Sequence, residues 1–330
     1  MNEHEIIQKL LEPFARSRDQ RNAPFGCDAE LVEIGGRLWG LTIDEFSPEE
    51  DLFSAEDPEC LGANLATATL SDLLAAGVEP RFFLHALSLP RAADTAFIEG
   101  VGRGIARVLQ EVGCTLCGGD IGTADPWRFC GFAMGPVTAE HPITHRIPDS
   151  PQDLWVSGEL GDANLAALQS LPAPRLELRL NEAALVRERA TACIDTSGGL
   201  LDAVWILHEQ NPTLRLQIDL DQIPFATGLA QFAQESGVSA EAALLGGAGE
   251  YELLFTTPAD LTERARARIV RAGAKCIGTV WPDPAPGIHF YRDSEYVGEM
   301  RQPPPCPRSA SNVAAHAQQV LRLATELFGR

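Results

Sequence analysis

The stretch ANLATATLSDLLAAGVEP (residues 63–80) places one carboxylate, Asp72, inside an otherwise apolar pattern. The residues that recur at helical spacing are Leu65, Thr69, Leu70, Leu73 and Ala76. This spacing predicts a helix with one buried face, which ends near Gly77 because glycine often follows the last helical turn. We therefore expect Asp72 at the edge of a hydrophobic core.

A carboxylate in that place needs a partner, because an ion that loses water without compensation costs several kcal/mol or changes its pKa until it is neutral. Two interpretations of Asp72 are open. It is either a capping or hydrogen-bonded structural residue, or a member of a functional site.

The length of 330 residues exceeds the usual size of a single core and predicts two domains of roughly 150 residues each. Residues 138–152 contain three prolines and no periodic pattern, which is typical of a domain boundary. We predict domains at residues 1–140 and 141–330. Strand and helix patterns occur together in both halves, so the predicted fold class is mixed α/β.

The net charge of −20 opposes binding to nucleic acid or to an anionic membrane surface. No apolar run approaches the roughly 18 residues of a membrane span, and the first residues carry charges, unlike a signal peptide. The eight scattered cysteines indicate reduced thiols rather than a disulfide framework. These features together predict a cytoplasmic protein.

Acidic residues within two positions of a glycine, serine or threonine occur in five segments, at predicted strand ends or in a helix. They are Asp28, Asp44, Asp72, Asp120 and Asp195. Oxygen ligands of this kind suit Mg²⁺, which typically bridges carboxylates to the phosphates of a nucleotide. Clustered carboxylates repel anions unless a cation neutralises them. The set therefore predicts metal-assisted phosphoryl transfer, in which no side chain has to act as a nucleophile.

Several local patterns are compatible with phosphate binding. Gly35-Gly36 predicts a hairpin that leads to Asp44, and Gly198-Gly199 precedes a predicted helix whose free N–H groups favour anions. Arg146 is either a phosphate contact or an exposed hinge residue.

Cys114 and Cys117 have metal-ligand spacing, but no second pair completes a zinc site. Walker, GxGxxG and GxSxG motifs are absent.

The ordered set of motifs resembles the thiamine-monophosphate kinase family, in the superfamily of aminoimidazole ribonucleotide synthetase. The motifs are FGCDAELV (25–32), LTIDEF (41–46), NLATATLSDLLAAGVEP (64–80), CGGDIG (117–122), THRIPDSPQDLWVSGELGDA (144–163), CIDTSGGLLDA (193–203) and GAGEYELLFT (247–256). Each motif is weak evidence alone, whereas seven in order are strong evidence.

The resemblance implies an N-terminal α/β domain whose sheet pairs with a second subunit in a homodimer, and a C-terminal α/β domain. It implies that ATP and Mg²⁺ bind in the cleft between them and that the γ-phosphate passes to thiamine phosphate. The five aspartates are then the metal ligands, of which Asp44, Asp72 and Asp120 are catalytic. Nucleotide contacts are expected at Gly119, Asp120, Arg146 and Ser197, and substrate contacts at Asp51 and Glu250.

Three departures from the family pattern affect the predicted site. Cys27 stands where the family has an aspartate, Gly198 replaces another metal carboxylate, and residues 248–250 differ from the family motif. A thiol is a poor ligand for Mg²⁺. Two alternatives to a thiamine-phosphate kinase therefore stay open: a related enzyme with another small acceptor, or a nucleotide-binding protein without kinase activity.

Overall fold

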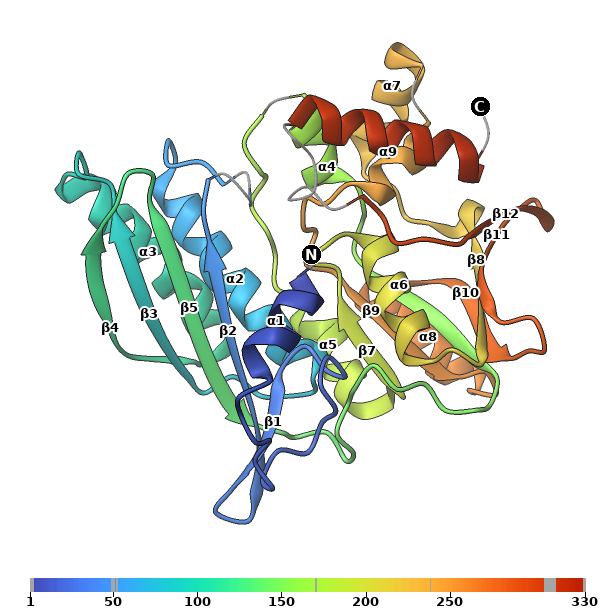
Figure 1. Cartoon of the computed structure of the whole chain (residues 1–330), viewed down its shortest axis with the longest axis horizontal. Helices are drawn as coiled ribbons and strands as arrows, with labels where there is room; N and C mark the ends of the chain where they lie inside the picture. The colour runs from blue at the N-terminus through green and yellow to red at the C-terminus, as the bar shows by residue number, and fades with distance from the viewer. Residues whose placement is uncertain are drawn as a thin grey trace.

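The computed structural model describes residues 3–48, 51, 53–169, 171–237, 239–305 and 313–328. Two sheets organise this part of the chain, and they lie in separate halves of the molecule (Figure 1). The first has the order β1-β2-β5-β3-β4 and the second has the order β12-β11-β8-β10-β6-β9-β7. The predicted mixed α/β class is confirmed.

The five-stranded sheet is formed by β1 (Glu30–Ile34), β2 (Arg37–Phe46), β3 (Phe82–Leu89), β4 (Thr115–Thr123) and β5 (Arg128–Pro136). The predicted hairpin between β1 and β2 is present. Gly35 and Gly36 have φ values of 58° and 76°, a left-handed conformation that glycine adopts without strain. The hairpin fixes the register of β2 and hence the place of Asp44 near its end.

Helices α2 (Pro58–Ala75) and α3 (Thr95–Val112) cover one face of this sheet (Figure 1). Their axes approach closely, because a Cβ atom at Gly62 would lie 2.1 Å from the carbonyl oxygen of Val101. Asp57 and Asp94 cap the two N-termini by accepting main-chain N–H groups. This pair of helices holds Asp72 beneath the sheet.

The expectation of a single buried face on α2 was wrong, because α2 is buried nearly all round. One side packs against β2 and β5, and its C-terminal end contacts β7 and α5 in the second half of the chain. A helix enclosed in this way has no polar stripe. The helix begins at Pro58, directly after the capping residue Asp57.

The seven-stranded sheet is formed by β6 (Gln152–Ser157), β7 (Ala192–Asp195), β8 (Leu214–Asp219), β9 (Leu253–Pro258), β10 (Ala274–Pro282), β11 (Gly287–Arg292) and β12 (Glu295–Met300). The other helices are α1 (Glu3–Leu11), α4 (Asp162–Leu168), α5 (Leu180–Arg189), α6 (Leu200–Gln210), α7 (Thr227–Ser236), α8 (Glu263–Ala272) and α9 (Val313–Phe328), with short 3₁₀ helices η1 (Leu220–Gln222) and η2 (Ala240–Leu245).

Tyr251 has a φ of 54°, which excludes extended backbone, and β9 starts at Leu253. The apolar face of α1 is largely exposed, with 66% of Leu10 accessible. Among the described residues, no helix is both long and apolar enough to span a membrane.

Candidate active site

Asp72 lies on the side of α2 that faces the sheet, where the Thr42 hydroxyl of β2 donates a hydrogen bond to its Oδ2 atom. Burial raises the pKa of Asp72 well above its usual range, and the nearby carboxylates of Asp44, Asp195 and Asp28 raise it further. Four of the five predicted aspartates therefore act on one another in space. They come from the loop before β1, from β2, from α2 and from the end of β7.

Asp120 does not join this group, because it lies on the opposite face of the five-stranded sheet. In the sheet register, Asp120 is opposite Ala86, Ala86 is opposite Cys130, and Cys130 is opposite Glu45. Asp44, one residue before Glu45, therefore points to the other face. That face is covered by α2, since a Cβ atom at Gly131, opposite Asp44, would meet the side chain of Thr69.

Asp28 joins the two halves of the molecule through both of its carboxylate oxygens. Its Oδ1 atom lies 3.0 Å from Nε2 of His145, and its Oδ2 atom accepts the main-chain N–H of Asp195 at 3.0 Å. The other ring nitrogen of His145, Nδ1, lies 2.9 Å from the carbonyl oxygen of Phe25. Burial alone would lower the pKa of His145, but the Asp28 carboxylate, the Phe25 carbonyl oxygen and the charge of Asp195 together offset this and raise it.

Asp195 is buried at the end of β7. Its Oδ1 atom accepts the main-chain N–H of Ser197 at 3.1 Å, whereas its Oδ2 atom is buried without a hydrogen-bond partner. Burial and the Asp28 carboxylate raise the pKa of Asp195 to about 7. A buried acceptor of this kind in an acidic cluster favours a bound cation.

The chemistry of this donor set fits Mg²⁺, because all four side chains offer carboxylate oxygens. The fit is incomplete in one respect: in the part of the chain that the structure describes, no three His, Cys, Asp or Glu residues approach closely enough to enclose a metal ion by themselves. Mg²⁺ commonly completes its shell with water and phosphate oxygens. Asp44, Asp72 and the free Oδ2 of Asp195 would hold it here.

Cys27, the residue that departs from the family pattern, lies at the border of this cluster. Its thiol donates a weak hydrogen bond to the carbonyl oxygen of Ile143, at 3.3 Å. Burial raises the pKa of Cys27, and the charge of Asp28 raises it further. Cys27 is therefore a neutral thiol that adds no charge to the carboxylates.

Gly198, the second departure, lies against a carboxylate from the next helical turn. A Cβ atom at Gly198 would be only 2.3 Å from Oδ2 of Asp202, in the first turn of α6. The carboxylate of Asp202 thus occupies the space that a side chain at position 198 would need. Gly199 has a φ of 89° and forms the turn that starts α6.

The two predicted substrate residues lie in different surroundings. Oδ2 of Asp51 accepts the main-chain N–H of Ser47 at 2.7 Å. The buried carboxylate of Glu250 accepts the main-chain N–H groups of Gly161, Ala163 and Asn164 at the start of α4. The structure therefore gives Glu250 a role in fixing α4, and burial raises its pKa to about 7.

The predicted nucleotide contacts are also separated. Arg146 is exposed and its guanidinium donates to the carbonyl oxygen of Gln210, away from Asp28. Gly119 packs against His85, because a Cβ atom there would lie 2.4 Å from the imidazole ring. The sequence interpretation chose Arg146 and missed its neighbour His145, which contacts Asp28. Position next to a predicted site residue was the only signal that could have indicated it.

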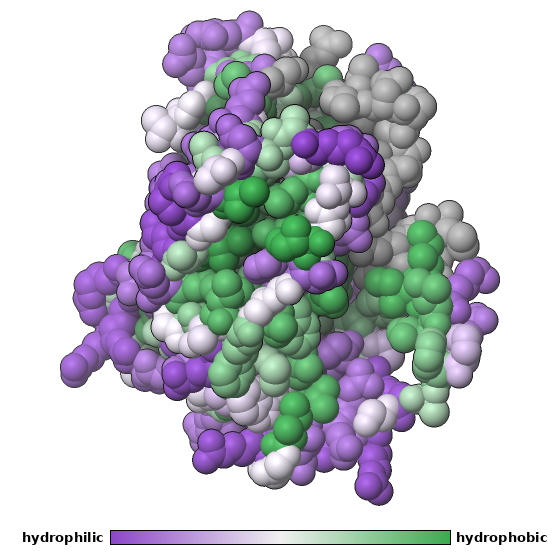
Figure 2. Space-filling view, turned by 90° about the vertical axis from the view of Figure 1, so that its left-hand side faces the viewer, coloured by the Kyte–Doolittle hydropathy of each residue, from purple (hydrophilic) through white to green (hydrophobic). Residues whose placement is uncertain are grey.

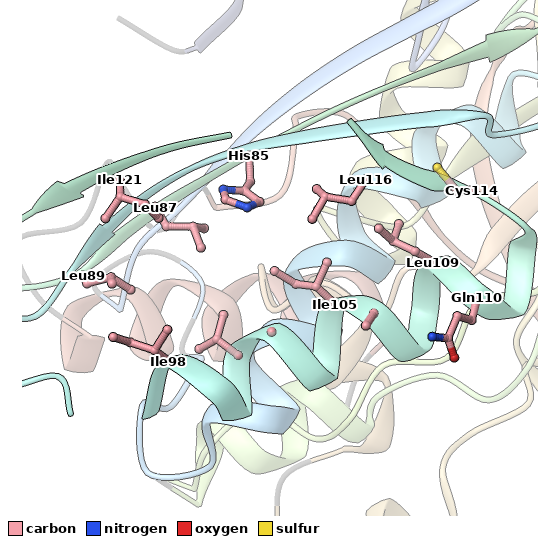
Figure 3. A pocket seen from close by; sticks show the side chains of 13 residues that line it. His85, Leu87, Leu89, Ile98, Ile105, Leu109, Gln110, Cys114, Leu116 and Ile121 are labelled. Carbon is pink, nitrogen blue, oxygen red and sulfur yellow. The ribbon is translucent and has the colours of Figure 1, made fainter. Parts of the chain in front are cut away.

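An apolar cavity of about 360 Å³ lies between α3 and the strands β3 and β4 (Figure 3). Its apolar lining includes Leu87, Ile105, Leu116 and Ile121, and the ring of His85 projects into it from β3 (Figure 3). The Nδ1 atom of His85 is buried and has no hydrogen-bond partner.

The chain was compared with known proteins. The family model described as "AIR synthase related protein, N-terminal domain" matches residues 26–137. The thiamine-monophosphate kinase of Archaeoglobus fulgidus is 30% identical over 268 residues, which cover 78% of this chain and 86% of that relative.

Solved structures share the fold. Thiamine-monophosphate kinase from Stenotrophomonas maltophilia gives a TM-score of 0.66 at 25% identity, covering 88% of this chain and 95% of that one. The structure of AaThiL complexed with AMPPCP and TMP gives a TM-score of 0.72 at 22% identity, covering 91% of this chain and 94% of that one. The similarity to the AaThiL structure, at 22% identity, shows only that the two chains share a fold.

Proposed function

Because this chain belongs to the thiamine-monophosphate kinase family, we propose that it transfers the γ-phosphate of ATP to thiamine phosphate and forms thiamine diphosphate. The observation that carries the proposal is the cluster of Asp28, Asp44, Asp72 and Asp195 at the junction of the two sheets. Carboxylates gathered this closely are costly in a fold unless a ligand uses them, and the charges of the others raise the pKa values of Asp72 and Asp195.

When bound, Mg²⁺ would supply the positive charge that stabilises the transferring phosphoryl group. The chain's own residues orient the site. The Thr42 hydroxyl fixes one oxygen of Asp72, and the turn at Ser197 fixes one oxygen of Asp195. Their second oxygens, Oδ1 of Asp72 and Oδ2 of Asp195, would be the ones that face a cation. The acceptor phosphate would attack in line, so no covalent intermediate on the protein is needed.

For the nucleotide, Gly119 and Asp120 stay in the proposal as contacts, beside the apolar cavity between α3 and β4. Gly119 and Asp120 lie on β4, whose residue Ile121 lines this cavity. The side chain of Asp120 points to the sheet face opposite α2, so the nucleotide would contact the main chain of β4 here. Ser197 and Arg146 stay in the proposal as phosphate contacts. To reach a phosphate, the guanidinium of Arg146 would have to give up its hydrogen bond to the carbonyl oxygen of Gln210.

The proposal includes a homodimer formed through the five-stranded sheet, with residues 1–140 as the dimerising, ATP- and Mg²⁺-binding unit and residues 141–330 completing the cleft. The sheet face opposite α2 exposes Ile43, Phe82 and Leu84. From the side of β4 and α3, apolar side chains cover much of the visible surface (Figure 2). Apolar patches of this kind favour association. A cytoplasmic location is also part of the proposal.

A second candidate function is nucleotide binding without phosphoryl transfer, or transfer to another small acceptor. The neutral thiol of Cys27 favours it, because the site then holds one charge fewer than the family pattern implies. The assay that separates these functions measures ADP release with Mg²⁺-ATP and thiamine phosphate. We expect ADP formation that depends on thiamine phosphate. Binding of ATP without any such release would contradict the kinase proposal.

A further inference from the structure

His145 lies at the point where the two halves of the chain meet beside the carboxylates. It is 4% exposed, and its side chain and main chain form hydrogen bonds with two segments of the chain. Its N–H donates to the carbonyl oxygen of Gly26 at 2.8 Å, and its carbonyl oxygen accepts from the Asn211 side chain at 2.7 Å. The loop before β1 is thereby fastened to the end of α6.

The ring of His145 faces acceptors with both nitrogens, the Phe25 carbonyl oxygen at 2.9 Å and Oδ1 of Asp28 at 3.0 Å. Asp28 in turn holds the N–H of Asp195 with its other oxygen. One line of contacts therefore runs from His145 through Asp28 to the main chain of Asp195. Asp28 cannot turn away from Asp195 while His145 holds it.

We propose that His145 is a positioning residue that fixes Asp28 and, through Asp28, sets the distance between the Asp28 and Asp195 carboxylates in the cluster. The inference rests on the cation site of the proposed function. Without His145, the Asp28 side chain would be free to rotate, and the loop of residues 25–28 would lose its attachment to the second half of the molecule. Partners that orient carboxylate or imidazole ligands commonly change metal affinity ~10- to 100-fold.

The experiment measures Mn²⁺ binding by electron paramagnetic resonance, with Mn²⁺ replacing Mg²⁺ and without ATP or thiamine phosphate. His145→Gln, Asp28→Asn and the double variant form a cycle, because the coupling between two side chains appears as non-additivity. His141→Gln is the matched control, since His141 is an exposed histidine of the same segment.

We expect His145→Gln to weaken Mn²⁺ binding about tenfold in the wild-type background and to have no further effect in the Asp28→Asn background. His141→Gln should bind as wild type does. A merely structural role would give equal effects of His145→Gln in both backgrounds and would overturn the inference, as would an absence of Mn²⁺ binding by the wild type.

Folding of each variant is checked by circular dichroism. If His145→Gln does not fold, His145→Asn takes its place in the same cycle, and amide exchange at Asp195 is followed in Asp28→Asn. We expect that amide to exchange at least tenfold faster than in wild type. Unchanged exchange would overturn the inference. The Mn²⁺ experiment contains no thiamine phosphate, so it does not depend on kinase activity. If His145→Gln and Asp28→Asn were non-additive in Mn²⁺ binding but the kinase assay failed, only the proposed function would be refuted.

Discussion

The carboxylate of Asp28 accepts the main-chain N–H of Asp195 at 3.0 Å, although 167 positions separate the two residues in the chain. This contact brings the end of β7 to the loop before β1, and with it the acidic residues of both halves. Asp72, on the enclosed helix α2, lies near Asp28 and Asp195, and the charges of both raise its pKa. The cluster therefore exists only in the assembled two-sheet structure.

Asp72→Asn should lower turnover strongly while leaving the unliganded protein at least as stable as the wild type. The raised pKa of Asp72 means that its charge is unfavourable in the fold, and asparagine can still accept from the Thr42 hydroxyl. Removing one charge-stabilising group commonly costs ~100- to 1000-fold in rate. Steady-state kinetics and a thermal melt without ligand measure the two effects.

The matched control is Asp94→Ala. Asp94 caps α3 by accepting the N–H of Phe97 at 2.8 Å, so its loss should cost about 1 kcal/mol without a direct effect on chemistry. If Asp72→Asn lowered the melting temperature as much as Asp94→Ala does, Asp72 would be a structural carboxylate.

Glu250 predicts a pH dependence of stability. Its pKa is raised from 4.5 to about 7 by burial, so the folded state holds a proton that the unfolded state has already released. This contribution is fully present below pH 4.5 and is lost as the pH rises to about 7, where roughly 3 kcal/mol of stability has gone. Urea unfolding at pH 5, 6, 7 and 8 measures it.

Comparison with Glu250→Gln isolates this residue from the other titrating groups. The wild type should lose stability relative to Glu250→Gln across that range, and the difference should level off above pH 7. A difference that stays constant with pH would show that Glu250 does not titrate there.

Restoring an aspartate at position 198 should destabilise the protein. A Cβ atom there would lie 2.3 Å from Oδ2 of Asp202, and a second carboxylate adds repulsion to the steric conflict. Gly198→Asp should therefore melt below Gly198→Ala, which carries the steric part alone. The double variant Gly198→Asp/Asp202→Ala should recover much of the loss. If Asp202→Ala gave no recovery, the two positions would not compete for the same space.

Cys27→Asp should lower the melting temperature in the absence of Mg²⁺, because it adds a charge beside Asp28 at a buried position. Added Mg²⁺ should recover part of this loss, and the recovery should exceed that of wild type. Cys27→Ser, which is neutral and similar in size, serves as the control. Equal effects of Mg²⁺ on both variants would place Cys27 outside the cation site.

Features encoded in neighbouring residues could be predicted from the sequence. Gly35-Gly36 correctly predicted a hairpin, and the apolar spacing around Asp72 correctly predicted a helix. The extent of its burial could not be predicted, since α3 packs along α2 and the C-terminal end of α2 contacts β7 and α5, more than 100 positions away in sequence. Local patterns contain no information about such packing.

The candidate site could be predicted only in part, because local patterns contain no information about how distant segments pack. The grouping of Asp28, Asp44, Asp72 and Asp195 followed from ordered motifs, whereas the direction of Asp120 depends on the register of β4 against β3. Register places a side chain on one face or the other, and a shift of one residue reverses it.

We propose that the carboxylate cluster supports transfer of the γ-phosphate of ATP to thiamine phosphate. The complete reaction can be followed by ³¹P nuclear magnetic resonance with Mg²⁺, comparing wild type with Asp72→Asn. We expect the resonances of thiamine diphosphate and ADP to grow together with wild type, and we expect Asp72→Asn to form them at least ~100-fold more slowly. Absence of thiamine diphosphate with folded, ATP-binding wild type, or equal rates for both proteins, would contradict it.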